Sequence, residues 1–310
     1  MSGLDAVGGG PVAELFASRQ VPLGGIRGMR VDRLLPHRSL PTVGGWCFLD
    51  RFGPQRVDMR VLPHPHTGLQ TVTWPLRGEV RHRDSLGNDV LVRPAQLNLM
   101  TAGHGVSHSE LSTGDAPLLH ALQLWLALPA GREGIAPGFE QHTELPTYEG
   151  GGLRATVLAG ALGEARSPAT VHTPLVGADL ELAAGTAASL PLRADFEHAL
   201  LVVDGEVSVA GTTVAAGPLL YLGTGRDALA VSAAANARAV LLGGEPFAGE
   251  LVMWWNFVGR SHEEIAAARA DWEDGDRFGE VAGHGGERVP APGLPGVRLR
   301  PRGRRSWAEG

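Results

Sequence analysis

The sequence predicts an all-β fold built from two similar halves and followed by a short helix. Glycine and proline are abundant, at 44 and 22 of 310 residues, and few stretches have helical periodicity, which is typical of β-proteins with many turns. The second half also repeats the pattern of the first. His198–Val207 resembles Val72–Val80, and Leu219–Gly225 resembles Leu97–Gly103. An internal duplication of a small β-barrel explains this repetition.

The expected strands of the first half follow one another closely. Residues 42–54 contain an apolar run that ends in a Gly-Pro turn. Residues 69–76 are rich in β-branched and aromatic side chains, which favour strands. A polar hairpin loop at 83–89 leads into a further strand at 90–100. Residues 118–128 place polar side chains among apolar ones, which indicates another barrel strand.

The repeat divides the chain into a first barrel over residues 1–135, a second barrel over 136–256, and a C-terminal helix and tail over 257–310. Ser261 is the expected N-cap of the helix, and Glu264 completes a capping box. An apolar stripe then follows, made of Ile265, Ala266, Ala268 and Trp272.

Charge and composition exclude several classes of protein. A net charge of −6 argues against nonspecific binding to nucleic acid. From residue 281 onward, Gly, Pro and Arg predict a poorly packed surface tail, including the short basic run Arg302–Arg305. Cys47, the only cysteine, lies in an apolar run and is expected to be a buried thiol. No leader pattern and no membrane-length apolar run occurs, so we expect a cytoplasmic protein without membrane or direct nucleic-acid partners.

Two short segments carry the residues that point to chemistry. His64 and His66 are two residues apart, and so are His108 and Glu110. Alternate residues of a β-strand point to the same face, so each pair can direct two ligands one way. Two neighbouring strands could then bring all four side chains together. Three imidazoles and a carboxylate suit a divalent transition metal, with one or two positions left for water or substrate.

The second half lacks a corresponding set of ligands. Projection along the repeat carries the four residues onto Pro191, Arg193, Ala230 and Ser232. If the halves share a fold, the histidines of the first half are not needed to build it. The sequence therefore predicts a functional site in the first barrel only.

Three other histidines have weaker claims on this site. His104, four residues before His108, is either a plain loop residue or a member of the pocket. His82 and His120 are interpreted as barrel or surface histidines, on the view that neither has a partner two residues away.

Both segments resemble motifs of the pirin family, in the cupin superfamily. His64–Gly68 matches the His-Pro-His-x-Gly motif of pirins, and Thr101–Glu110 matches Thr-Ala-Gly-x-Gly-x-x-His-x-Glu. Further pirin landmarks occur in family order at Phe48–Pro54, Leu122–Trp125, Trp255–Val258 and Glu263–Ile265. The resemblance implies a bicupin, with two stacked barrels and a metal, usually iron, in the N-terminal one. It maps the metal ligands onto His64, His66, His108 and Glu110.

The resemblance leaves two kinds of function open. Some pirin-like proteins oxidise the flavonol quercetin with O2, and others are described as iron-dependent transcriptional coregulators. The first reading predicts a quercetin 2,3-dioxygenase-type oxidoreductase acting on a phenolic substrate. Its metal would be Fe(II) foremost, with Zn, Mn, Ni or Cu as alternatives. The second predicts a non-catalytic iron or redox sensor that binds a regulator protein.

In the enzyme reading, Glu110 ligates the metal and also serves as the general base that removes the proton of the flavonol 3-hydroxyl. Trp74, Met100 and Leu69 are candidates for an apolar pocket wall. Trp74 and Trp125 have a competing interpretation as core residues, which is a commoner role for tryptophan than a substrate platform.

Overall fold

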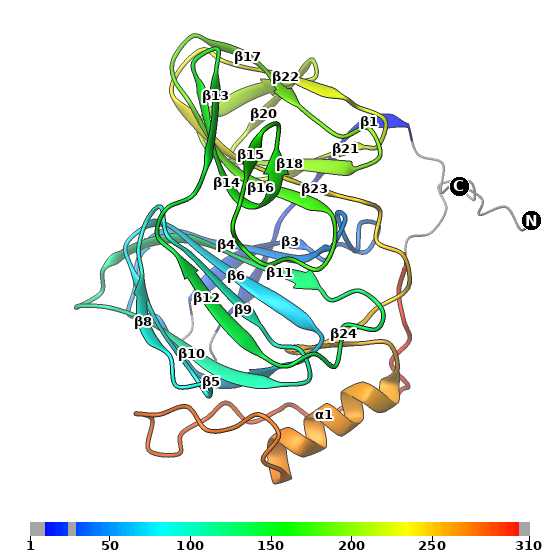
Figure 1. Ribbon diagram of the computed structural model, residues 1–310. Coiled ribbons are helices and arrows are strands. Elements are labelled where there is room, and N and C mark those ends of the chain that lie inside the picture. The colour runs from blue at the N-terminus through cyan, green and yellow to red at the C-terminus, as the bar shows by residue number, and fades with distance from the viewer. Residues whose placement is uncertain (1–9, 24–28, 304–310) are drawn as a thin grey trace, which may run out of the picture.

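The computed structural model describes residues 10–23 and 29–303. Within these residues the chain forms 25 strands and one helix. Figure 1 shows two β-barrels stacked on one another, with the helix lying below the first barrel. The expected all-β fold of two barrels with a C-terminal helix is confirmed.

The first barrel is made of a seven-stranded and a four-stranded antiparallel sheet. In spatial order, the larger sheet consists of β12 (Gly138–His142), β9 (Leu97–Thr101), β6 (Leu69–Arg77), β11 (Leu118–Ala127), β4 (Trp46–Arg56), β3 (Arg30–Leu35) and β2 (Arg19–Pro22). The smaller sheet consists of β5 (Arg60–His66), β10 (Val106–Ser112), β7 (Val80–Asp84) and β8 (Asp89–Val92).

The second barrel repeats this plan. Its larger sheet runs β1 (Pro11–Phe16), β21 (Leu219–Gly223), β18 (Glu197–Asp204), β23 (Ala237–Gly244), β16 (Leu175–Leu182), β14 (Leu153–Leu162) and β13 (Thr147–Gly150), with β15 (Ala165–Arg166) on β14. Its smaller sheet runs β17 (Thr186–Pro191), β22 (Ala228–Ala233), β19 (Glu206–Val209) and β20 (Thr212–Ala215). Strand β1 therefore reaches across from the N-terminus to the second barrel, while β12 pairs with β9 of the first.

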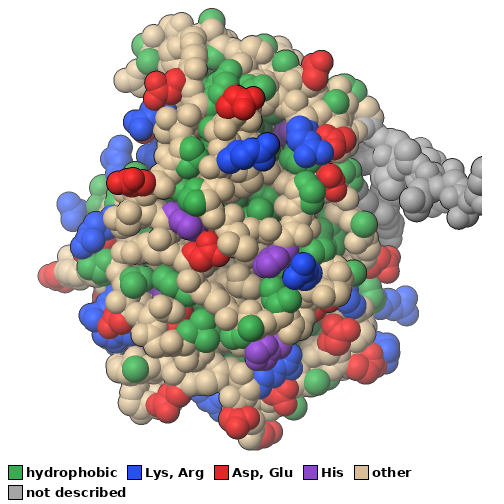
Figure 2. Space-filling view, in the orientation of Figure 1, with side chains coloured by type: hydrophobic (Ala, Val, Ile, Leu, Met, Phe, Trp, Pro, Cys, Tyr) green, Lys and Arg blue, Asp and Glu red, His purple; other side chains and the backbone are tan. Residues whose placement is uncertain are grey.

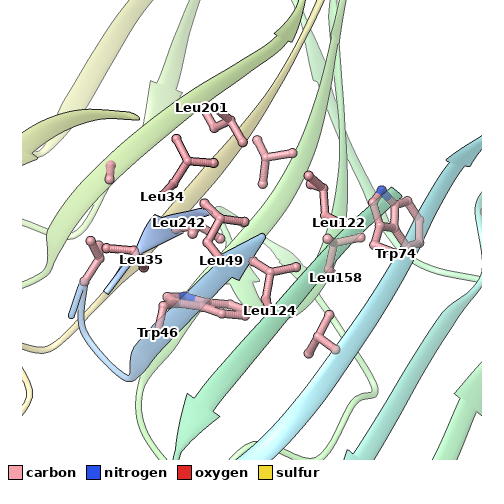
Figure 3. Close-up of a cluster of buried hydrophobic side chains, with 14 of the residues drawn as sticks. Leu34, Leu35, Trp46, Leu49, Trp74, Leu122, Leu124, Leu158, Leu201 and Leu242 are labelled. Carbon is pink, nitrogen blue, oxygen red and sulfur yellow. The ribbon is translucent and has the colours of Figure 1, made fainter. Parts of the chain in front are cut away.

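The two larger sheets face one another and share a hydrophobic core. Figure 3 shows Leu49 and Leu122 of the first barrel beside Leu201 and Leu242 of the second. Trp46 is fully buried there, and its Nε1 donates a hydrogen bond to the carbonyl oxygen of Val176 at 3.1 Å. The central strands of these sheets are therefore covered on both faces, by the interior of their own barrel and by the other barrel.

This double burial explains the long apolar runs in the sequence. Strand β6 is buried at every position except its last, and so is β18. By contrast, β22 of the second barrel's smaller sheet alternates exposed and buried residues, because its outer face meets solvent.

The helix α1 (His262–Asp274) begins where the capping signal predicted it. The Ser261 side chain accepts a hydrogen bond from the backbone N–H of Glu264, and Glu264 in turn accepts from the backbone of Arg260. Ile265 and Trp272 are buried as expected, whereas Ala266 stays partly exposed. At 13 residues, α1 is the only helix in the described ranges, and it is too short and too polar to cross a bilayer.

After residue 281 the described part of the tail lies along the surface with most residues exposed, as expected, but it is anchored to the barrel at several points. Val281 is buried, and the backbone N–H of Val289 donates to the carbonyl oxygen of Pro63 at 2.8 Å. Strand β5 is the edge of its sheet, so its unpaired carbonyls are available to a covering segment. The tail supplies that cover. Part of the basic run, Arg304 and Arg305, lies outside the described residues.

The surface carries charges of both signs. Figure 2 shows a face on which acidic and basic side chains are interspersed rather than separated by sign. This face offers no extended basic stripe of the kind that nucleic-acid backbones require.

A substitution at Gly177 tests the shared core. A Cβ at Gly177 would lie 2.6 Å from Cζ2 of Trp46, so we expect Gly177→Ala to lower the free energy of unfolding by about 1–3 kcal/mol through overpacking. Chemical denaturation measures this, with Gly138→Ala as the matched control, because a Cβ there meets no atom within 4 Å. Equal stability of the two variants would show that the interface is not tightly packed.

Candidate metal centre

The two predicted segments form neighbouring antiparallel strands, β5 and β10. His64 lies directly opposite His108 in this pair. The register shifts between His108 and Glu110, because β5 has one more residue than β10 in the interval between Val61 and His64. A bulge of this kind re-aims the neighbouring side chains, and such bulges are common beside functional sites.

Three of the four predicted ligands come together. The ring nitrogens of His64, His66 and His108 form a group within 4.8 Å of one another, and all three side chains are buried. Nε2 of His66 lies 3.1 Å from Nε2 of His108. Two nitrogens that bind one metal at about 2.1 Å can be no more than about 4.2 Å apart. The nitrogens of His66 and His108 are therefore close enough to bind one metal ion, with His64 beside them.

Glu110 belongs to a second, overlapping group. Its carboxylate lies within 4.8 Å of ligand atoms of His82 and His108, not in the group with His64 and His66. The hydroxyl of Thr73 donates a hydrogen bond to Oε1 of Glu110 at 2.8 Å. The structure thus brings a His/Glu cluster together, and the four-residue ligand set remains a prediction.

Backbone carbonyls fix the tautomers of two of the imidazoles. Nδ1 of His64 lies 2.9 Å from the carbonyl oxygen of Leu62, and Nδ1 of His66 lies 3.1 Å from that of Asn256. A carbonyl oxygen only accepts hydrogen bonds, so each Nδ1 carries the hydrogen. In the neutral rings Nε2 is then unprotonated, which is the form that binds a metal.

Burial keeps these rings neutral. It lowers the pKa of His64 to about 4, and it lowers the pKa of His66 and His108 well below the usual value, with the neighbouring histidines adding to the effect. The same burial raises the pKa of Glu110. Neutral imidazoles need to lose no proton when a metal binds.

The carbonyl of Asn256 reaches His66 through a tight hairpin between β24 (Val252–Trp254) and β25 (Phe257–Gly259). Trp255 in this turn has a left-handed φ of 53°, which is uncommon for a bulky residue. Strand β25 passes so close to β5 that a Cβ at Gly68 would lie 2.1 Å from the carbonyl oxygen of Val258. Sequence reasoning missed this partner because a backbone acceptor 190 residues away leaves no local signal.

The interpretation of His82 as lacking a partner two residues away is wrong. Asp84 is that partner, and its Oδ2 lies 3.2 Å from Nε2 of His82. Both side chains are buried on β7, where residues alternate between buried and partly exposed. The spacing His-x-Asp on an alternating strand was the signal that could have revealed the pair.

An aromatic wall borders the group, but it is not the one predicted from Trp74. The indole of Trp74 points into the core between the barrels and donates to Asp179. Instead Trp125 packs edge-on against His66, with ring centroids 5.1 Å apart, and stacks on Phe48 at 4.0 Å. The other two predicted wall residues, Leu69 and Met100, belong to the same cluster as Trp125.

His104 and His120 lie outside both groups of candidate ligands. His104 is exposed in the loop between β9 and β10, where its Nδ1 donates to the carbonyl oxygen of Ile135. His120 is buried on β11, and its Nε2 has no partner among the described residues.

The family of the chain is decided by comparison with known proteins. The Pirin family matches residues 28–126, and the Pirin C-terminal cupin domain matches residues 177–279. The chain belongs to the pirin family. The two stacked barrels of this pirin are therefore the expected bicupin.

Individual relatives agree with this assignment. A Pseudomonas aeruginosa protein provisionally named a quercetin 2,3-dioxygenase is 47% identical over 90% of this chain and 89% of its own. The crystal structure of a quercetin 2,3-dioxygenase from Acinetobacter baumannii is 41% identical, covers 93% of this chain and 97% of its own, and has a TM-score of 0.88. The bacterial pirin YhhW from Escherichia coli, crystallised with nickel(II), shares the fold at 19% identity and a TM-score of 0.61, over 76% of this chain and all of its own.

The second barrel of this pirin has no counterpart of the cluster. Strands β17 and β22 correspond to β5 and β10, and their pairing places Ser189 and Pro191 at the positions of His64 and His66. The projected Pro191 and Arg193 were thus two residues too far along. The prediction of a site in the first barrel only is unaffected by this shift. Among the described residues, both groups of candidate ligands lie in the first barrel.

A single alanine substitution tests the metal centre. His66→Ala removes one of three converging nitrogens, so we expect metal affinity to fall more than about 100-fold, beyond the 10–100-fold typical of residues that only support a ligand. Competition with a chelator measures this affinity. His104→Ala is the matched control, because it removes an exposed histidine outside the cluster. Unchanged affinity in His66→Ala would refute the placement of the metal.

A buried histidine of the second barrel, His198, is expected to make the stability of the protein depend on pH. His198 on β18 is fully buried, neither ring nitrogen has a partner among the described residues, and burial lowers its pKa to about 4. Between pH 6.5 and 4 the unfolded chain binds a proton that the folded chain excludes, so stability falls as the pH falls. We expect His198→Leu to remove about 3 kcal/mol of this acid destabilisation. Urea titrations of both proteins at pH 7 and pH 4 measure the difference, and parallel losses would contradict it.

Proposed function

We propose that this pirin is a metal-dependent dioxygenase that acts on a flavonol-like phenolic of the quercetin type. One observation carries the proposal: three neutral imidazoles converge beside an aromatic wall formed by Trp125 and Phe48. His64, His66 and His108, with Glu110, would hold the metal. The relatives named as quercetin 2,3-dioxygenases support the same reaction.

The bound metal would supply a Lewis acid for the deprotonated 3-hydroxyl of the flavonol and a redox centre for O2. Iron(II) is our first choice because iron is the usual metal of pirins. Zn, Mn, Ni and Cu are alternatives, because His and Glu donors accept all of these ions.

Glu110 would act as the general base. Burial raises the pKa of this carboxyl, so its ionised form is a stronger base than a surface carboxylate and is better matched to a phenolic hydroxyl. The Thr73 hydroxyl, 2.8 Å from Oε1, orients the carboxylate. Proton removal at this point would leave the flavonol as an anion facing the imidazole cluster.

The four side chains of the site differ slightly in solvent exposure, and this difference indicates the side from which a substrate would enter. His66 and His108 are each 1% exposed, whereas His64 and Glu110 are 7% and 9% exposed. Substrate would therefore reach the cluster on the side of His64 and Glu110. Trp125, on the His66 side, would help to exclude water from the cluster.

The near-complete burial of the cluster favours a second candidate function. A site this enclosed leaves little room for a flavonol, and it would suit a non-catalytic iron or redox sensor that binds a regulator protein. Such a protein would bind metal without turning over a phenolic.

An oxygen-dependence experiment separates the two candidates. Metal-loaded protein is titrated with quercetin without oxygen, and oxygen is then admitted while the flavonol absorbance is followed. We expect the flavonol absorbance to be lost over many turnovers, at a rate proportional to the amount of bound metal. Glu110→Gln should lower turnover by about 100-fold or more because it removes the base, and His104→Ala should match the unaltered protein.

Tight metal binding with no turnover of quercetin or related phenolics would overturn the dioxygenase proposal and favour the sensor. Full activity in Glu110→Gln would leave the dioxygenase in place but remove Glu110 from the role of base.

A further inference from the structure

A chain of buried polar groups extends behind His108, away from the other imidazoles. Nδ1 of His108 lies 3.3 Å from Nδ1 of His82, and Nε2 of His82 lies 3.2 Å from Oδ2 of Asp84. Each of the three residues is at most 2% exposed. Buried polar groups in such a chain must each find a donor or an acceptor, so the hydrogens can be assigned from one end to the other.

Asp84 fixes the outer end of this chain as an acceptor. Its Oδ1 accepts hydrogen bonds from the backbone N–H groups of Leu86 and Asn88 at 2.9 and 3.0 Å, and both oxygens accept from the Asn88 side-chain amide. A carboxylate with this many N–H donors is ionised and only accepts. Nε2 of His82 therefore carries a hydrogen that it donates to Asp84, and in the neutral ring Nδ1 of His82 is an acceptor.

The assignment then passes to His108. With His82 neutral, its Nδ1 accepts, so Nδ1 of His108 carries the hydrogen between them and Nε2 of His108 is unprotonated. This nitrogen faces Nε2 of His66 at 3.1 Å, which the carbonyl of Asn256 leaves unprotonated as well. Two lone pairs at this distance repel one another unless a cation lies between them.

We propose that His82 and Asp84 are positioning residues of the metal centre, holding His108 in the tautomer and orientation that present Nε2 to the metal. The inference rests on the proposed metal centre and extends it to two residues outside the predicted ligand set. The ring of His82 is itself held in place, stacked on Phe139 with centroids 4.6 Å apart. Both nitrogens of His82 are engaged, which distinguishes it from a fourth imidazole ligand.

Paired substitutions of His82 test this role. His82→Phe keeps an aromatic ring against Phe139 but removes both nitrogens. His82→Asn retains an amide oxygen close to the position of Nδ1, which can still accept from His108. We expect nickel(II) affinity, measured by chelator competition, to fall 10–100-fold in His82→Phe and to recover in part in His82→Asn.

Spectroscopy separates positioning from direct ligation. The absorption bands of cobalt(II)-loaded His82→Phe should keep the intensity that reports the same number of ligands, with a shift in wavelength only. Metal stoichiometry at saturation should stay at that of the unaltered protein. A change in ligand number or stoichiometry would identify His82 as a ligand and overturn the positioning role.

A second pair of variants guards against a fold defect, because Asp84 also holds the turn between β7 and β8. Asp84→Asn weakens the acceptor that faces His82, whereas Asn88→Ala removes donors to Asp84 without touching His82. We expect the nickel affinity to fall in Asp84→Asn and to stay within about threefold in Asn88→Ala, at similar thermal stability of the metal-free proteins. Equal losses in both variants would overturn the inference.

The outcomes also distinguish this inference from the proposed function. If the unaltered protein binds metal but oxidises no phenolic, the dioxygenase proposal fails while the positioning role is still measured by affinity. If His82→Phe binds nickel as the unaltered protein does, the positioning role fails and the dioxygenase proposal stands. If the unaltered protein binds no metal, both are wrong.

Discussion

Each imidazole of the cluster depends on a hydrogen-bond acceptor that receives its Nδ1–H. The three acceptors come from different parts of the molecule: the neighbouring backbone at Leu62, the distant hairpin at Asn256, and the side chain of His82. A buried ring without such an acceptor would bear the cost of an unsatisfied donor, and it could also turn its other nitrogen away from the metal. The chemistry of the site therefore rests on hydrogen bonds made on the far side of each ring.

The two barrels share a fold, but among the described residues only the first carries the cluster of candidate metal ligands. The smaller sheets of the two barrels have the same strand order, yet their outer faces differ. In the second barrel the outer face meets solvent, so successive residues of β22 alternate between exposed and buried. In the first, the segment after α1 covers it, with Ser107 donating to the carbonyl of Phe278 and Ser109 contacting His284. The strands that carry the histidines are thus held from both faces.

The core between the barrels supplies the rigidity behind this arrangement. The larger sheet of the first barrel is pinned by Trp46, whose indole reaches carbonyl groups of the second barrel. The aromatic wall rises from the same sheet, since Phe48 and Trp125 lie opposite one another on β4 and β11. Packing between the barrels and the position of the wall are therefore linked through two adjacent strands.

The sequence by itself determined the all-β class, the duplication, the helix cap at Ser261 and the strand pairs that carry His64, His66 and His108. These features depend on periodicity of two and on local capping, which are readable over a few residues. Only the tertiary structure decided that Trp125 rather than Trp74 borders the cluster, since strand β6 is buried on both faces and an apolar pattern does not distinguish them. The partners Asn256 and His82, the grouping of Glu110 with His82 and His108, and the anchoring of the tail were likewise decided in three dimensions. They depend on which distant segments meet, and no local pattern of residues records that.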